Sequence, residues 1–258
     1  MKILVCIKQV PEFEQIEINE GPDGEAVFEE LTEYRMNRFD EYAVEAAVQI
    51  RENLGSTSVD VLTAGPERSA EAVKRAIGMG ADHGIHLKTE DDVDFSPSAI
   101  AGWIAAYAKS KVYHLILTGS MSEDAMNGQV APMVAAGLQL PGATQVIDVR
   151  LSEDLSEVCI EREIEGGHRE EIRLQLPAVL AIQTGANQPR YPSLSNLLRA
   201  NKQVLEQVDT YALGGAAHRE QLLGFSLPRK TRAGRHLSGS PREKADQLLA
   251  LLRNKAFI

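Results

Sequence analysis

Short aliphatic segments alternate with longer segments of helical periodicity through the first 140 or so residues of the chain. Segments that alternate in this way predict βαβ units, and therefore an α/β fold with a mostly parallel sheet, right-handed crossovers and helices on both faces. The predicted strands are Ile3–Ile7, Ser58–Thr63, His83–Leu87 and Tyr113–Thr118, and the predicted helices are Asp40–Asn53, Glu67–Met79, Pro97–Lys109 and Asn127–Leu138.

The pattern changes near residue 143, where strand-like segments follow one another with few helices between them. The turn Glu165-Gly166-Gly167-His168 is typical of a β-hairpin, so we expect antiparallel strands to extend the sheet. The segments are Thr144–Leu151, Glu157–Glu163, Arg169–Leu174 and Val179–Thr184; a small hairpin is also predicted at Gln15–Ile18 and Ala26–Glu29, and a short helix, capped by Ser193, at Ser193–Asn201.

The last 47 or so residues have a different character, rich in Gly, Pro, Ser and charge, before the amphipathic segment Pro241–Lys255. We expect residues 1–211 to form one α/β domain and residues 212–258 to form an arm that leaves it. The apolar stripe of the final helix indicates either docking on a partner chain or packing against the chain's own domain.

Composition excludes several classes of function. A net charge of -10 argues against a nucleic-acid binder, which needs a surplus of Lys and Arg. Cys6 and Cys159 lie far apart, and the six histidines have no metal-ligand spacing, so no metal site is expected. The N-terminus lacks signal-peptide features and no stretch has transmembrane length, which predicts a cytoplasmic protein without membrane insertion.

Motifs of bond-making chemistry are also missing. The sequence contains no G-x-x-x-x-G-K-[ST], no G-x-G-x-x-G after the first strand and no G-x-S-x-G. We therefore predict no catalytic residues and a protein that binds rather than catalyses.

The carboxyl ends of the predicted parallel strands mark where a ligand would bind. Four segments meet this criterion: Lys8–Pro11, Met36–Asp40, Ala64–Pro66 and Gly119–Val130. The last is long for a connection between a strand and a helix, and its small residues would let backbone N–H groups approach a phosphate beside a helix N-terminus. Asn37 and Asp40 are equally good helix caps. The sequence thus predicts one crevice at the rim of the sheet.

Several stretches in this order and spacing resemble the beta subunits of electron-transfer flavoproteins, a family that includes the FixA-like proteins. The stretches are Val5–Pro11, Met36–Ala43, Gly78–Asp82, Gly119–Val130, Glu161–Glu163, Leu176–Val179 and Pro189–Leu194. The resemblance spans nearly the whole chain. It implies a Rossmann-like domain that binds an adenine nucleotide and pairs with an alpha subunit, which holds most of the site for the electron-carrying FAD.

The resemblance also implies roles for particular residues. Phe13 and Phe39 would lie near the FAD of the alpha subunit. A recognition loop near 187–202 would bind dehydrogenases, with Leu194 as its apolar anchor beside Pro189, Arg190, Tyr191 and Lys202. The nucleotide contacts would be Cys6, Asn37, Arg38, Phe39, Asp40, Ala64, Gly119, Ser120, Met121, Ser122, Glu123, Asp124, Asn127, Gly128, Gln129 and Val130.

The loop after the fourth strand departs from the family pattern, because it has no basic residue at position 120 and carries an acid at Glu123. The nucleotide would be a structural AMP in an electron shuttle between dehydrogenases and an acceptor such as a quinone reductase. The alternatives are a second FAD in an electron-bifurcating complex, or a nucleotide-binding protein that acts without a partner.

Overall fold

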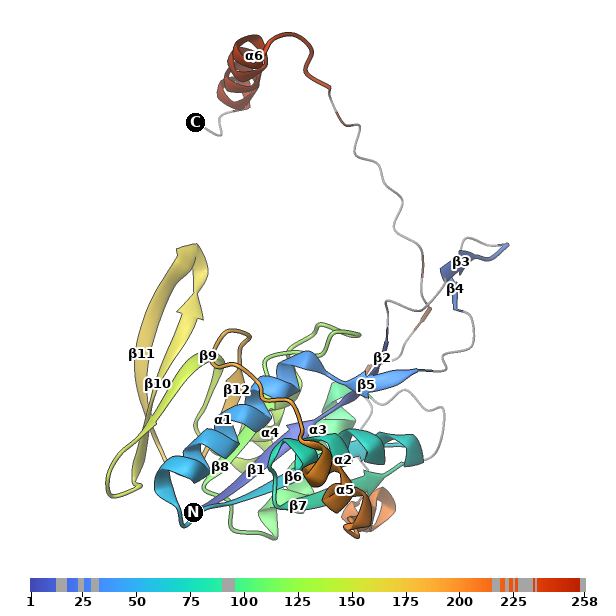
Figure 1. Cartoon of the computed structure of the whole chain (residues 1–258), viewed down its shortest axis with the longest axis vertical. Coiled ribbons are helices and arrows are strands. Elements are labelled where there is room, and N and C mark those ends of the chain that lie inside the picture. The colour runs from blue at the N-terminus through green and yellow to red at the C-terminus, as the bar shows by residue number, and fades with distance from the viewer. Residues whose placement is uncertain are drawn as a thin grey trace. The chain divides into compact units, whose positions relative to one another are not determined.

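A computed structural model of the chain describes residues 1–12, 18–22, 26–28, 33–89, 96–214, 219–220, 223–224, 226, 234 and 236–255 (Figure 1). The chain forms two compact units. The first comprises Met1–Ile18 and Phe28–Leu223, and the second comprises Asn19–Val27 and Gly224–Ile258.

The first unit is built on a nine-stranded sheet, as far as the described residues extend. Neighbouring strands are parallel from β9 to β13, whereas β9, β10 and β11 pair antiparallel. In spatial order the strands are β11 (His168–Gln175), β10 (Glu157–Ile164), β9 (Gly142–Leu151), β12 (Ala178–Ile182), β8 (Leu115–Gly119), β1 (Lys2–Ile7), β6 (Ser58–Gly65), β7 (His83–Lys88) and β13 (Glu206–Asp209). The predicted α/β class, with added antiparallel strands, is confirmed.

Helices cover both faces of the sheet (Figure 1). On one face, α1 (Arg38–Leu54) and α2 (Ala70–Met79) pack on alternate residues of β1 such as Ile3 and Val5. On the other, α3 (Pro97–Lys109) and α4 (Val130–Leu138) pack on Leu4 and Cys6. Because β1 is buried on both sides, it has the continuous aliphatic sequence of a central parallel strand.

A further helix, α5 (Leu194–Lys202), packs on the outside of α2. Its Ala200 is fully buried, and a Cβ atom on Gly78 of α2 would lie 2.8 Å from the Leu197 side chain. The lack of a side chain at Gly78 thus makes room for Leu197 where the two helices meet. As predicted, Ser193 caps α5, accepting a hydrogen bond from the Asn196 amide at 3.2 Å.

The structure also differs from the predicted elements. The helix expected at Asn127–Leu138 begins only at Val130, because Gly128 has a φ of 62° that no helix permits. Two short strands at the rim were not predicted: β2 (Gln9–Pro11) pairs with β5 (Tyr34–Met36). Strand β13 was missed as well. The remaining short elements are the 3-10 helices η2 (Glu67–Ser69), η3 (Glu165–Gly167) and η4 (Thr210–Leu213).

A two-stranded sheet is present at the predicted hairpin, with β3 (Ile18–Glu20) paired to β4 (Ala26–Phe28). Strand β4 agrees with the prediction, whereas β3 shares only Ile18 with the predicted Gln15–Ile18; residues 15–17 and 29 lie outside the described residues. In the second unit, α6 (Pro241–Asn254) begins at a capping box formed by Ser240 and Glu243. Leu248 and Leu249 of its apolar stripe are 49% and 39% exposed, so what covers this stripe stays a prediction. No described helix combines the length and apolarity needed to cross a membrane.

Candidate functional site

The N-terminus of α1 lies directly against the ends of β1 and β8. Strand β1 pairs with β6 on one side and β8 on the other, and the chain turns in opposite directions on these two sides. This is the switch point at which open α/β sheets bind ligands. A Cβ atom on Gly119 would lie 2.5 Å from Asp40 Oδ1 and 2.7 Å from the Phe39 carbonyl carbon, so only glycine fits here.

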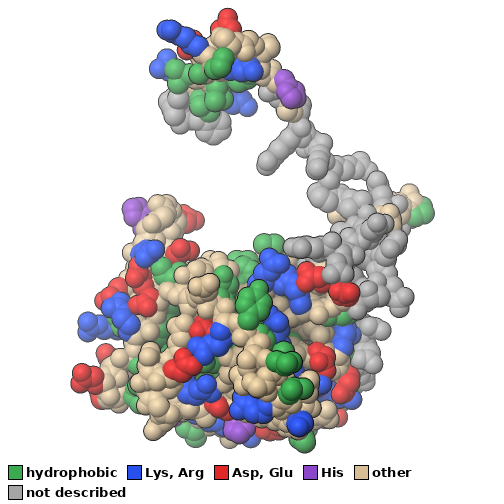
Figure 2. All heavy atoms as spheres, in the orientation of Figure 1, with side chains coloured by type: hydrophobic (Ala, Val, Ile, Leu, Met, Phe, Trp, Pro, Cys, Tyr) green, Lys and Arg blue, Asp and Glu red, His purple; other side chains and the backbone are tan. Residues whose placement is uncertain are grey.

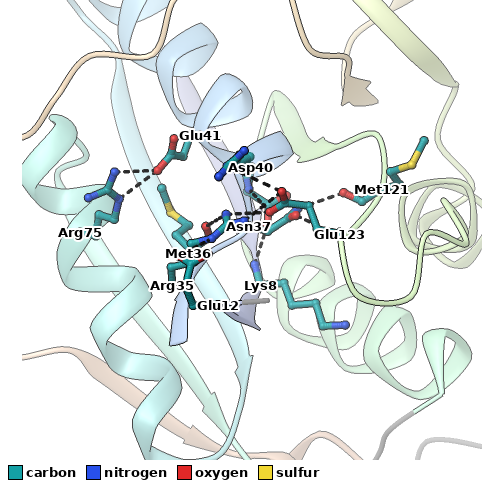
Figure 3. Close-up of polar contacts among 11 residues, drawn as sticks. Lys8, Glu12, Arg35, Met36, Asn37, Asp40, Glu41, Arg75, Met121 and Glu123 are labelled. Carbon is teal, nitrogen blue, oxygen red and sulfur yellow. Dashed lines mark hydrogen bonds and ion pairs between the residues drawn. The ribbon is translucent and has the colours of Figure 1, made fainter. Parts of the chain in front are cut away.

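Asp40 fastens the two strand ends together (Figure 3). Its Oδ2 accepts a hydrogen bond from the Lys8 amide at 2.7 Å and its Oδ1 accepts one from the Gly119 amide at 3.0 Å. The side chain is 5% exposed, and this burial raises the pKa of Asp40 to about 7, although both amide donors favour the charged form. Asp40 therefore links the ends of β1 and β8 at the rim.

Asn37 holds the loop Gly119–Gln129 closed over the rim. Its side-chain Nδ2 donates to the Met121 carbonyl at 2.9 Å, and its Oδ1 accepts from the Glu123 amide at 3.1 Å. Asn37 occupies the cap position of α1, but its side chain bonds the loop rather than the helix amides. The Asn37 side chain therefore does not act as the helix cap that the sequence allowed, and its contact with a nucleotide stays a prediction.

Glu123 occupies the N-terminus of α1. Its carboxylate accepts from both terminal nitrogens of Arg35, at 2.7 and 3.1 Å, and from the Arg38 backbone amide at 3.1 Å. Burial alone would raise the pKa of Glu123, but these donors outweigh it and hold that pKa below its ordinary value. The Glu123 carboxylate thus neutralises Arg35. Arg35 was not predicted as a site residue, although it precedes Asn37 by only two residues.

Further contacts attach the loop to the ends of β1 and β12. Lys8 forms an ion pair with Asp124 at 2.5 Å, and this pair outweighs burial to lower the pKa of Asp124. The Ser120 amide donates to the Ile182 carbonyl at 2.8 Å, and its hydroxyl donates to Gln183 at 3.1 Å. The loop therefore has a defined conformation set by its own contacts.

A second helix N-terminus, that of α4, also reaches the rim. Asn127, Gly128 and Gln129 lead into Val130, and the Gln129 side chain does not cap the helix. A Cβ atom on Gly128 would lie 3.2 Å from the Ser120 carbonyl oxygen. Gly128 thus lets the backbone pass close to Ser120 where α4 begins, and the first N–H groups of α4 can donate hydrogen bonds to an anion.

The remaining predicted nucleotide contacts lie around this centre. Cys6 is a buried residue of β1, and burial raises the pKa of its thiol far above the ordinary range. Ala64 is half-buried near the end of β6, Phe39 lies beside Gly119, and Ser122 accepts from the Met126 amide at 2.8 Å. Phe13 lies outside the described residues. No group of three His, Cys, Asp or Glu side chains in the described part of the chain could hold a metal ion.

The predicted recognition residues lie on a different surface, over α1 and α2. Arg190 turns inward onto α1, whereas Tyr191 and Leu194 are 90% and 75% exposed. Pro189 is half-buried and Lys202 is exposed at the end of α5. Hydrophobic side chains are visible at the surface over α5 in Figure 2, in agreement with the 55% exposure of Leu198.

The fold and the rim together define an α/β protein with an open, mostly parallel sheet, in which a switch point, a glycine-containing loop and an uncapped helix N-terminus lie at one edge. Comparison with known proteins gives a narrower assignment. The family model described as "Electron transfer flavoprotein domain" matches residues 25–213. The chain belongs to the electron transfer flavoprotein beta-subunit family, and the family prediction is confirmed.

Curated relatives match along most of their length. The chain is 34% identical to "Electron transfer flavoprotein subunit beta" of Bacillus subtilis (strain 168), with 88% of each protein covered. It is 32% identical to the mitochondrial beta subunit of Oryza sativa subsp. japonica over 100% of both chains. It is 31% identical to the beta subunit of Syntrophomonas wolfei, and the alignment covers 98% of this chain and 96% of the relative.

Proposed function

We propose that the chain is the beta subunit of a heterodimeric electron-transfer flavoprotein, in which an alpha subunit holds most of the FAD site. The complex takes electrons from dehydrogenases in the cytoplasm and delivers them to an acceptor such as a quinone reductase. Membership of the beta-subunit family over nearly the whole chain is the observation that carries this proposal. The chain itself acts as an electron-carrier subunit rather than a catalyst.

The rim binds an adenine nucleotide in this proposal, and its charges favour AMP. Two helix N-termini reach the rim, but the carboxylate of Glu123 already occupies that of α1, at 3.1 Å from the Arg38 amide. The uncapped N-terminus of α4 is left for a phosphate. One such position suits the single phosphate of AMP, whereas the pyrophosphate of FAD carries more charge past Glu123 and Asp124.

The residues around the rim then have distinct roles. The backbone at Asn127–Val130 would hold the phosphate, while Ala64, Cys6 and Phe39 would border the nucleoside. Asn37, Asp40 and Glu123 would shape the loop, because their polar atoms are engaged within the chain. A nucleotide bound only by the folded state would add stability by mass action.

Two further parts of the chain serve the complex. The arm, residues 212–258, would dock on the alpha subunit and cover the apolar stripe of α6, with Phe13 and Phe39 facing the FAD. Tyr191, Leu194 and Leu198 would form the surface that binds dehydrogenases, since large apolar side chains exposed together mark an interaction site.

Mass analysis of the small molecules released by denaturing the purified heterodimer tests the nucleotide. We expect one FAD and one AMP for each heterodimer. Two FAD molecules for each heterodimer, with no AMP, would support the electron-bifurcating alternative instead. A chain that purifies without any alpha subunit or nucleotide would overturn the proposal.

A pair of variants at the first residue of α4 locates the phosphate. Val130→Glu places a negative charge at the helix N-terminus, whereas Val130→Gln has the same size without the charge. We expect the Glu variant to lose AMP and the Gln variant to retain it. Equal AMP content in both would show that the phosphate binds elsewhere.

A further inference from the structure

Arg190 holds residues 187–193, the docking segment, to α1 by two forked ion pairs. Its Nε and one terminal nitrogen donate to the two oxygens of Glu45 at 2.8 and 2.9 Å. Its terminal nitrogens also donate to the two oxygens of Glu52 at 2.6 and 3.0 Å. The Arg190 backbone amide adds a bond to Glu45 at 3.2 Å. The guanidinium group thus donates four hydrogen bonds, all of them to carboxylates of α1.

The burial of Glu45 shows that this contact belongs to the folded chain. The Glu45 side chain is 4% exposed, whereas that of Glu52, about two turns further along α1, is 50% exposed. A buried carboxylate needs a paired cation, because an unpaired buried charge is strongly destabilising. Arg190 is thus committed to Glu45 and is not a free cation for a partner protein to bind.

Contacts on either side of Arg190 complete the attachment. The Asn187 side chain donates to the Tyr42 carbonyl of α1 at 2.9 Å. A Cβ atom on Gly78 of α2 would lie 3.0 Å from Pro192 Cβ, so Pro192 rests on that helix. Tyr191, between two anchored residues, is nevertheless 90% exposed. The segment is attached through alternate residues that leave one side chain pointing to solvent.

We propose that Arg190 is a positioning residue: by clamping Glu45 and Glu52 it holds Tyr191 and Leu194 outward before a dehydrogenase arrives. This inference rests on the proposed function of Tyr191 and Leu194 as the docking surface. It assigns Arg190, which the resemblance places among the recognition residues, to the inside of the segment rather than to the contact itself. A surface ordered in advance binds more tightly, because less conformational entropy is lost on docking.

The variant Arg190→Lys separates positioning from direct contact. Lysine keeps the positive charge, so Glu45 is not left without a cation, but an ammonium group cannot form two forks at once. Glu52→Gln removes only the outer, half-exposed fork and leaves the buried pair intact. Arg75→Lys is the matched control, since Arg75 donates two hydrogen bonds to Glu41 of the same helix away from the docking segment.

Two readouts on the intact heterodimer decide the proposal. Hydrogen exchange measures the order of residues 185–193, and steady-state reduction by a purified dehydrogenase that reduces the wild-type heterodimer measures docking. For Arg190→Lys we expect exchange in 185–193 to accelerate about tenfold and the apparent KM for the heterodimer to rise about tenfold, at an unchanged maximal rate. Glu52→Gln should change both in the same direction by about threefold, and Arg75→Lys should change neither.

Normal docking by Arg190→Lys would overturn the proposal, because charge alone would then be sufficient, and so would unchanged exchange in 185–193. The proposed function fails in a different way: the wild-type heterodimer would accept no electrons, or Leu194→Ala would dock as well as wild type. The exchange measurement does not depend on the dehydrogenase, so it tests the clamp in either case.

Discussion

The pH dependence of stability tests whether Asp40 is buried as the structure describes. Asp40→Asn keeps the size of the side chain and removes its ability to ionise. The amide oxygen can still accept a hydrogen bond from the Lys8 or the Gly119 amide, while the NH2 group meets the other donor. The variant therefore removes both the ionisation of the Asp40 carboxyl group and one hydrogen bond. Of these two losses, only that of the ionisation changes stability in a way that depends on pH.

The sign of the effect follows from the direction of the pKa shift. Burial raises the pKa of Asp40 from 3.8 to about 7, so the folded chain binds this proton more tightly than the unfolded chain. Protonation stabilises the fold fully below pH 3.8, and the contribution is lost as the pH rises through about 7. The whole shift corresponds to about 4 kcal/mol. Between pH 5 and pH 8 the linkage relation gives a loss of about 2.5 kcal/mol.

Urea unfolding at pH 5, 6, 7 and 8 measures this loss as the difference between wild type and Asp40→Asn. The free energy of unfolding of wild type should fall relative to the variant by about 2.5 kcal/mol across the range, a midpoint shift of about 1 M. Asp124→Asn is the control, because the ion pair with Lys8 lowers the pKa of Asp124. Its contribution should be constant above pH 5.

A difference between wild type and Asp40→Asn that is independent of pH would refute the reasoning. The two amide donors would then stabilise the carboxylate enough to outweigh its burial, and Asp40 would carry its charge throughout the range. A difference that grew with pH would show that these donors lower the pKa below that of the unfolded chain.

Three further outcomes follow from the geometry. Gly119→Ala should destabilise the fold by about 3 kcal/mol in urea unfolding, because the added Cβ would meet Asp40 and Phe39; Gly234→Ala, which meets no atom within 4 Å, should change nothing. Asn37→Ala should accelerate hydrogen exchange at Met121–Glu123 about tenfold, since two hydrogen bonds to the loop are lost. Tyr113→Phe should lower thermal stability by about 1–2 kcal/mol, because buried Asp60 loses the 2.7 Å hydrogen bond from the Tyr113 hydroxyl.

Periodicity and turn residues were sufficient to predict most of the sheet and the helices. Strand β1, with five consecutive buried residues, and α2, which Gly80 ends, carry strong local signals. Strand β13 was missed because its four residues, Glu206–Asp209, are mostly polar and exposed. It is an edge strand paired only with β7 through its backbone, and such pairing leaves little trace in hydrophobicity.

The position of the candidate site could be predicted, whereas its internal contacts could not. The rule for parallel sheets led from the strand ends to Asn37, Asp40 and the loop Gly119–Val130. Sequence could not show that Arg35 and Glu123, 88 residues apart, form an ion pair. The pairing depends on how the loop closes, and a loop conformation is set by tertiary contacts rather than by local propensity. The acid at position 123, a departure from the family pattern, was the available signal.

Helix α1 connects the two regions for which functions are proposed. Its N-cap residue Asn37 and Asp40 of its first turn lie at the rim, and its later turns carry Glu45 and Glu52, which bind Arg190 of the docking segment. Between them its inner face is closely packed against the sheet. A helix held along its length keeps the rim and the docking segment at a fixed separation. On α1, Asp40 thus positions the rim, Glu45 and Glu52 position the docking segment, and the apolar residues hold the helix on the sheet.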